Sequence, residues 1–147
     1  MGNTNSIIKI NFESVQRAIA SGNAYIINTL RAANQHCLIL KTLSIEEEVT
    51  ILNNNISKNK ELPIIVYGEN ACDDTVDKKC QQLLGLGFKN IYVYPGGLFE
   101  WLILQDIYGD DEFKTSGKCK DLLEYKNCLS DGYKINQCTP NRLSLLT

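Results

Sequence analysis

Six cysteines are the residues of this sequence best suited to covalent chemistry, because a thiolate can attack an electrophile or exchange disulfides. Cys72 is the best placed of them. It lies in the loop 68–74, between an apolar run at 64–67 and a helical pattern that begins near Thr75. The N-terminus of a helix stabilises a thiolate, so a cysteine at this point is suited to group transfer. Cys72 is therefore the candidate catalytic residue.

Three carboxylates surround this thiol, at Glu69, Asp73 and Asp74. Nearby carboxylates disfavour a thiolate and repel anionic substrates. The helix dipole acts in the opposite direction, but it contributes only about 0.3–1 kcal/mol at an exposed site. We therefore expect the carboxylates to prevail, which makes catalysis by Cys72 the less favoured interpretation. The acidic loop, as it is called below, comprises Gly68, Glu69, Asn70, Ala71, Cys72, Asp73 and Asp74.

The acidic side chains have a simpler role than metal binding. Asp73 or Asp74 can cap the following helix, and Asp77 in its first turn interacts favourably with the helix dipole. A carboxylate cage for a metal ion needs more ligands than one short loop supplies. The sequence therefore predicts no metal site and no cofactor.

The other cysteines and the single histidine do not form a recognisable reactive set. Cys37 begins an apolar run and Cys80 lies on the apolar side of a helical pattern, so both are expected to be core thiols. His36 is expected to be structural, because no cysteine is placed to act with it. Zinc ligands usually come as closely spaced pairs. Roughly ten residues separate neighbouring members of the set Cys119, Cys128 and Cys138, so a zinc site there is not expected.

The loop belongs to a unit that runs from Pro63 to Trp101. Apolar runs of strand type at 64–67 and 91–94 flank a helical stretch at 75–86, which Gly87 ends. Two strands joined through a helix are parallel neighbours in a sheet. Functional crevices in such sheets lie beyond the carboxyl ends of the strands, which again indicates the acidic loop.

Further elements surround this unit. A helix at 12–20 has Asn11 as its N-cap and Gly22 as its stop. A second helix opens with a capping box and is expected to extend to about residue 54. Its box pairs Ser44 with Glu47, and its inward residues are expected to be Ile45, Val49 and Leu52. The remaining elements are expected as strands at 7–10, 25–27 and 37–40 and an apolar helix at 98–104.

Composition excludes several classes of protein. The net charge is −2 and no basic stripe is interleaved with aromatic residues, so nucleic-acid binding is not expected. No apolar run approaches the roughly 20 residues that span a bilayer. The N-terminus lacks the apolar region of a secretory signal, and we expect free thiols in a reducing compartment. These features predict a cytoplasmic protein that is not secreted.

The first six residues match the N-myristoylation pattern, with Gly2 as the acceptor and Ser6 as the preferred hydroxyl residue. A plain polar terminus is the alternative. One myristoyl chain gives only marginal membrane binding, and Lys9 and Arg17 are too few for a strong basic second signal. The sequence thus divides into a possible lipidation segment at 1–6, a domain at 7–112 and a cysteine-containing tail at 113–147.

The unit around the acidic loop also carries a family motif. Its matching residues are Leu86-Gly87-Phe88, Asn90 to Tyr94, Gly96-Gly97 and Glu100-Trp101. With the alternating strands and helices, they resemble the rhodanese-like domain over about residues 7–112. The resemblance implies a three-layer α/β/α fold with a central parallel sheet. In active members it also implies sulfur transfer by a cysteine persulfide directly after the central strand, usually with an arginine at the end of the loop.

This sequence departs from that motif at the chemical centre. Gly68 stands at the nucleophile position, and the loop contains no arginine. Asn28-Thr29-Leu30 stands where active members usually have an acidic residue, an apolar residue and an arginine. The loop is also about two residues longer than is usual for sulfurtransferases. That length is similar to the cell-cycle dual-specificity phosphatases, which share the fold and also need both the cysteine and the arginine.

Two functions remain open at this point. The first is a non-catalytic binding or structural module whose partner is another protein, with possible attachment to a membrane surface. The segment 97–109 also resembles a rhodanese-like subgroup encoded by large double-stranded DNA viruses, which adds association with a virion or with infection. The alternative is a sulfurtransferase or thiol-redox enzyme that uses Cys72.

Overall fold

A computed structural model describes residues 7–127 of the chain. Its centre is a four-stranded parallel sheet with the strand order β1-β5-β4-β2. The central strand β4 is apolar and buried along its whole length, and its Ile65 is paired with Ile26 on one side and Tyr92 on the other. The predicted parallel sheet is thereby confirmed. Its strands are β1 (Ile8–Lys9), β2 (Tyr25–Asn28), β4 (Ile64–Tyr67) and β5 (Ile91–Val93).

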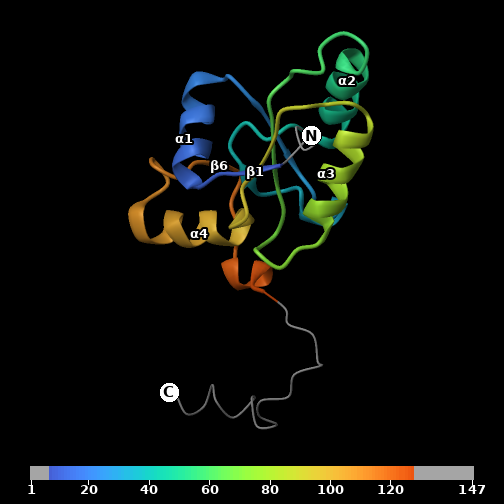
Figure 1. Cartoon of the computed structure of the whole chain (residues 1–147). Helices are drawn as coiled ribbons and strands as arrows, with labels where there is room; N and C mark the ends of the chain where they lie inside the picture. Colours follow the sequence, from blue (N-terminus) through green and yellow to red (C-terminus); the bar gives the residue numbers. More distant parts are fainter. Residues whose placement is uncertain (1–6, 128–147) are drawn as a thin grey trace, which may run out of the picture.

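Helices cover both faces of this sheet, as Figure 1 shows. One core cluster contains residues of α1 and α4, and a second contains residues of α2 and α3. The sheet separates the two clusters, so the protein has the three-layer α/β/α architecture that the sequence predicts. The helices are α1 (Phe12–Ser21), α2 (Ile45–Asn55), α3 (Thr75–Gly85) and α4 (Gly97–Tyr108).

The predicted helix ends are present. The side chain of Asn11 accepts a hydrogen bond from the backbone N–H of Ser14, and Gly22 ends α1 in the left-handed conformation. Ser44 and Glu47 form the reciprocal capping box at the start of α2. These local interactions depend on residues three or four apart, which is why the sequence alone could identify them.

The inward face of α2 differs from the prediction. Ile45 and Val49 are 49% and 53% exposed, whereas Glu48 is only 7% exposed. The Glu48 carboxylate lies 2.5 Å from the ammonium of Lys79 on α3. This ion pair turns Glu48 toward α3, and Leu52, one turn further along the helix, packs against the core as expected. The prediction that Ile45 and Val49 point inward is therefore wrong.

The apolar run 37–40 does not join the parallel sheet. Within it, β3 (Leu38–Ile39) pairs antiparallel with β6 (Thr115–Ser116). Thr42 and Leu43 take the place beside β2 instead, through a bridge to Ile26 and a hydrogen bond to its carbonyl. A strand near the end of the described chain thus pairs with one from its first third.

Residues 113–127, called the C-terminal segment below, pack against the domain. Phe113 and Tyr125 are 3% and 1% exposed and belong to the same core cluster as α1 and α4. Two short 3₁₀ helices complete the described chain, η2 (Ala32–Asn34) and η3 (Leu122–Tyr125). The sequence ends the domain at residue 112, but the packed structure continues to Tyr125.

No helix within residues 7–127 combines the length and the apolar character that a membrane span requires. Gly2, the predicted lipidation site, lies outside the described residues, and so do Cys128 and Cys138.

Candidate functional site

The acidic loop lies directly after β4 and leads into α3, at the carboxyl end of the parallel sheet, as predicted. Its first two carbonyls are fixed by the start of α4: Gly68 accepts a 2.9 Å hydrogen bond from the N–H of Leu98, and Glu69 a 2.8 Å bond from Phe99. Gly97 makes this approach possible, because a Cβ there would lie 2.7 Å from the Gly68 carbonyl oxygen. Its φ of +70° also favours glycine.

The carboxylate of Asp73 binds hydrogen-bond donors at both ends of the acidic loop, from Glu69 and from Thr75. Oδ2 accepts a 2.9 Å hydrogen bond from the N–H of Glu69. Oδ1 accepts 3.0 Å and 2.5 Å bonds from the N–H and the hydroxyl of Thr75. Loops of this kind bind external anions through such donors at a helix N-terminus. Here an internal carboxylate already binds two such N–H groups, those of Glu69 and Thr75, so the protein supplies its own anion at these donors.

Gly68, at the position of the family nucleophile, has no room for a side chain. A Cβ at this position would lie 2.5 Å from Asp73 Oδ2, 2.6 Å from Val76 Cγ2 and 2.9 Å from Thr29 Oγ1. The hydroxyls of Thr29 and Thr75 are joined by a 2.8 Å hydrogen bond, which closes the same space from the side of β2. The neighbours of Gly68 therefore fill the volume that a nucleophilic side chain would need.

Asn70 connects the loop to the C-terminal segment. The side chain is 8% exposed, and its Oδ1 accepts a 2.9 Å hydrogen bond from the N–H of Cys72. Its Nδ2 donates to the carbonyls of Tyr125, at 2.8 Å, and Lys126, at 3.2 Å. No sequence pattern indicated this role of Asn70, because its partners lie 55 and 56 residues further along the chain.

Cys72 is exposed and lines an open cavity of about 310 Å³. Its thiol has no hydrogen-bond partner among residues 7–127, and His36 does not line this cavity. Arg31 does line it, although the sequence offered no sign that this arginine approaches the loop. The other lining residues are Thr29, Leu30, Glu69, Asn70, Asp73, Asp74 and Thr75.

The two neighbouring aspartates of the loop have different roles. Asp74 occupies the N-cap position of α3, but its side chain makes no capping hydrogen bond and is 79% exposed. The cap is supplied by Asp73 through the N–H of Thr75. The sequence indicated one or the other, and the structure assigns the capping contact to Asp73.

The remaining candidates are structural. Cys37 and Cys80 are buried, and burial raises the pKa of each thiol to about 11. Trp101 is fully buried and donates a 3.0 Å hydrogen bond from Nε1 to the carbonyl of Lys114. Among the described residues, no three His, Cys, Asp or Glu side chains are grouped closely enough to hold a metal ion.

Comparison with known proteins identifies a family whose domain covers the acidic loop and most of the sheet. The family profile of the rhodanese-like domain matches residues 24–104, more than half of the 147-residue chain. No curated protein sequence matches the chain.

Solved structures share the fold at low sequence identity. The BH2092 protein of Bacillus halodurans is 18% identical, with a TM-score of 0.56 over 75% of this chain and 77% of that one. The Alr3790 protein of Anabaena sp. is 21% identical, with a TM-score of 0.52 over 74% of this chain and 91% of that one.

A thiosulfate sulfurtransferase of Pseudomonas aeruginosa is 19% identical, with a TM-score of 0.52 over 66% of this chain and 19% of that one. The match of the family profile and the shared fold lead to one conclusion: this chain belongs to the rhodanese-like domain family.

Proposed function

We propose that this chain is a non-catalytic rhodanese-like module that binds another protein at the acidic loop. One observation supports this most strongly: the Asp73 carboxylate binds the N–H of Glu69 and both the N–H and the hydroxyl of Thr75, so it bridges the two ends of the loop. An anionic sulfur donor would have to displace a carboxylate that is covalently part of the same loop. The lack of room at Gly68 adds to the argument, because the family position of the persulfide cannot hold a side chain without a shift of its neighbours.

The charge of the loop indicates the chemistry of the partner. Glu69 is half-buried and Asp74 is exposed, so negative charge reaches the surface beside Cys72. Complementary charge favours a lysine- or arginine-rich protein surface over an anionic substrate or a nucleic acid. Two cations oppose part of this negative charge: Arg31 lines the same cavity, and the ammonium of Lys78 lies 4.0 Å from the carboxylate of Asp74.

The catalytic part of the proposal is tested by sulfur-transfer assays with thiosulfate and with persulfide donors. We expect no turnover above the uncatalysed rate for the wild-type chain. Turnover by the wild type that disappears in Cys72→Ser would overturn the proposal. Cys80→Ser is the matched control, because Cys80 is a buried thiol outside the loop.

The binding part is tested with a lysine-rich synthetic peptide as the probe. We expect Asp74→Lys to weaken binding about tenfold at low salt, because it replaces an exposed attractive charge by a repulsive one. Asp110→Lys makes the same charge change at an exposed site away from the loop and is expected to leave the affinity unchanged. Equal loss in both variants would show that only net charge matters.

An enzyme that uses Cys72 is the second candidate, and one observation favours it. The thiol is exposed in a cavity of about 310 Å³ that Arg31 also lines, and a guanidinium is a suitable group for an anionic sulfur donor. Alkylation of Cys72 at neutral pH, faster than that of a free cysteine peptide and matched by turnover, supports this candidate. Labelling no faster than the peptide, with no turnover, rejects it.

The terminus supports a separate part of the proposal. The Met-Gly-Asn-Thr-Asn-Ser start suggests myristoylation of Gly2 and attachment of a cytoplasmic protein to a membrane surface. The resemblance of residues 97–109 to a viral subgroup suggests that this takes place in a virion or an infected cell. The intact mass of the chain from a eukaryotic host tests the modification. An unmodified Gly2 rejects it, whereas bacterial expression is no test because the modifying enzyme is absent.

A further inference from the structure

Two further thiols lie outside the acidic loop, where β3 meets β6. The antiparallel register pairs Leu38 with Ser116, and one further step brings Cys37 opposite Gly117. The Cys37 thiol lies 3.9 Å from the carbonyl oxygen of Gly117. Cys119 follows two residues after Gly117, and it lies close enough to Cys37 to raise the pKa of that thiol.

The two thiols share one environment. Cys37 is fully buried in the core cluster that contains α1 and α4, and the half-buried Cys119 packs against the same cluster. Tyr125 lies beside both: burial, followed by the nearby Cys119 and Cys37, raises its pKa to about 12. Its buried hydroxyl meets no nitrogen or oxygen partner in the described chain, and its polar neighbour is the thiol of Cys119. Both thiols thus lie close to this hydroxyl.

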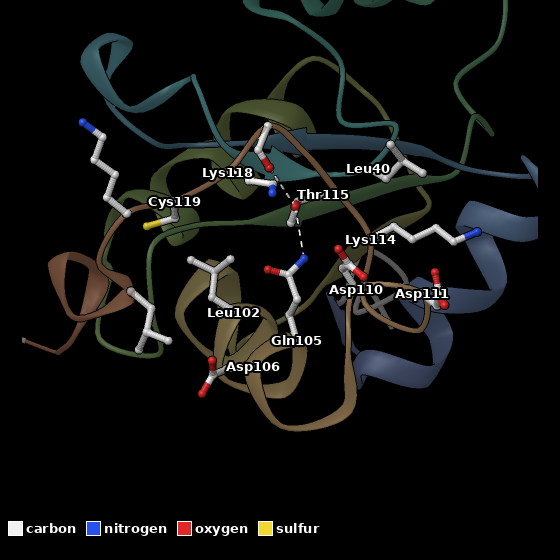
Figure 2. A pocket seen from close by; sticks show the side chains of 13 residues that line it. Leu40, Leu102, Gln105, Asp106, Asp110, Asp111, Lys114, Thr115, Lys118 and Cys119 are labelled. Carbon is white, nitrogen blue, oxygen red and sulfur yellow. Dashed lines mark hydrogen bonds between the residues drawn. The ribbon is translucent and has the colours of Figure 1, made fainter.

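Access to this pair comes from one side. Cys119 lines a cavity of about 810 Å³ between α4 and the C-terminal segment, and Figure 2 shows its sulfur beside this space. Leu102 and Gln105 of α4 form the opposite wall. Cys37 does not line the cavity and has no exposed surface. A small oxidant from solvent therefore reaches Cys119 first.

We propose that Cys37 and Cys119 are a redox modification site that closes to a reversible disulfide when a hydroperoxide oxidises Cys119. The Cys119 thiol gives up its proton and its sulfur attacks a peroxide oxygen; an S–O bond forms, the O–O bond breaks, and the leaving oxygen takes up that proton and departs as water or alcohol. The sulfur of Cys37 then attacks that of Cys119. An S–S bond forms, the S–O bond breaks, and the hydroxide leaves as water with the proton of the Cys37 thiol.

The residues next to Cys119 can make the movement that a disulfide with Cys37 requires. A disulfide needs the two Cβ atoms about 3.5–4.5 Å apart. Residues 117–121 form neither helix nor strand, and Gly117 has a φ of +99°. A shift of these residues, with β3 held in the core, would bring the sulfurs to that separation.

Closure would connect this site to the acidic loop. Residues 119–126 lead from Cys119 to the two carbonyls that Asn70 holds. A disulfide would fix one end of this stretch to β3, while Asn70 fixes the other end to the loop. The expected consequence is slower opening of the C-terminal segment in the oxidised protein.

The full-length chain, treated with equimolar hydrogen peroxide and then alkylated, tests the proposal by mass spectrometry of non-reduced peptides. We expect a cross-linked pair of peptides containing Cys37 and Cys119, which disappears after treatment with a thiol reductant. Cys119→Ala removes the cross-link, and because this side chain is half-buried the variant is expected to fold. Cys80→Ala is the matched control for loss of a buried thiol and leaves the cross-link in place. Amide hydrogen exchange in residues 118–127 is expected to slow at least threefold on oxidation of the wild type and to stay unchanged in Cys119→Ala.

Three outcomes would overturn the proposal. In the first, Cys119 is oxidised to sulfenic or sulfinic acid while Cys37 remains a free thiol. In the second, Cys119 forms its cross-link with Cys128 or Cys138 instead of Cys37. In the third, the wild type gives no intramolecular cross-link under conditions that oxidise the exposed Cys72.

Discussion

The acidic loop and the β3–β6 ribbon both contain a thiol near an opening in the surface, but their polar groups are used differently. In the loop, Asp73 accepts hydrogen bonds from the N–H groups of Glu69 and Thr75, and Asn70 accepts one from the N–H of Cys72. The exposed thiol of Cys72 makes no hydrogen bond within the described chain. In the ribbon, two thiols lie near the buried hydroxyl of Tyr125. The acidic loop stands at the active-site position of the family, whereas the neighbouring thiols of this chain lie at the β3–β6 ribbon. A family's active-site position thus need not be where one member has its reactive groups.

The largest effect is expected where the C-terminal segment joins the core. Trp101 is fully buried, is hydrogen-bonded to the Lys114 carbonyl and packs edge-on against Phe113 at a ring separation of 5.1 Å. We expect Trp101→Ala to reduce the free energy of unfolding by about 3–5 kcal/mol in urea denaturation. Ile107→Ala, on the same helix but 64% exposed, should change it by less than about 0.5 kcal/mol. Similar values for both would contradict the packing described for the segment.

The comparison is sharpened next by restoring the family nucleophile. We expect Gly68→Cys to cost about 1–3 kcal/mol of stability, because the added Cβ overlaps three neighbouring side chains. We also expect no sulfur transfer from this variant. Gly85→Cys is the matched control, since a Cβ at Gly85 meets no atom within 4 Å. An active and fully stable Gly68→Cys protein would show that the loop is still a working sulfurtransferase site.

Asp73 and Asp74 provide a comparison within the loop itself. Asp73→Ala removes hydrogen bonds to Glu69 and Thr75, and we expect a loss of about 1–2 kcal/mol in urea denaturation. The freed N–H groups should also make the variant more strongly stabilised by added sulfate than the wild type. Asp74→Ala removes only an exposed 4.0 Å ion pair with Lys78, so its effect should be below about 0.5 kcal/mol. Equal effects would disprove the central role of Asp73.

The smallest effect at neutral pH, and a growing one above it, concerns the buried thiols. Burial raises the pKa of Cys37 and Cys80 from 9.0 to about 11, so the folded chain keeps these protons after the unfolded chain has released them. Their contribution to stability is therefore complete below pH 9 and declines as the pH rises toward 11. Urea midpoints measured from pH 8 to 11 should fall, and in Cys80→Ala they should fall less. Identical slopes would reject the assignment to Cys80.

Local patterns predicted most of the fold. Strand-type runs, the helix between 75 and 86 and the caps at Asn11 and Ser44 depend on residues close together in sequence, and all are present. The inward face of α2 was predicted incorrectly because hydrophobicity alone cannot reveal that Glu48 meets Lys79, 31 residues away.

The candidate site was predictable only in its outline. The position of the acidic loop follows from the βαβ pattern and the carboxyl-end rule. Its internal arrangement does not, because the same residues could have left Asp73 facing solvent. The approach of Arg31 and the link from Asn70 to Tyr125 depend on how distant segments pack, and no spacing in the sequence encodes either contact.

The link between Asn70 and the C-terminal segment has a consequence for how the protein can change over generations. Asn70 holds main-chain carbonyls, which every amino acid possesses, so replacing Lys126 leaves both acceptors in place. Gaining or losing one residue between Cys119 and Tyr125 would instead present different carbonyls to the amide. Inherited insertions or deletions upstream of position 126 should therefore be rare, whereas this contact itself places no requirement on the side chain at that position.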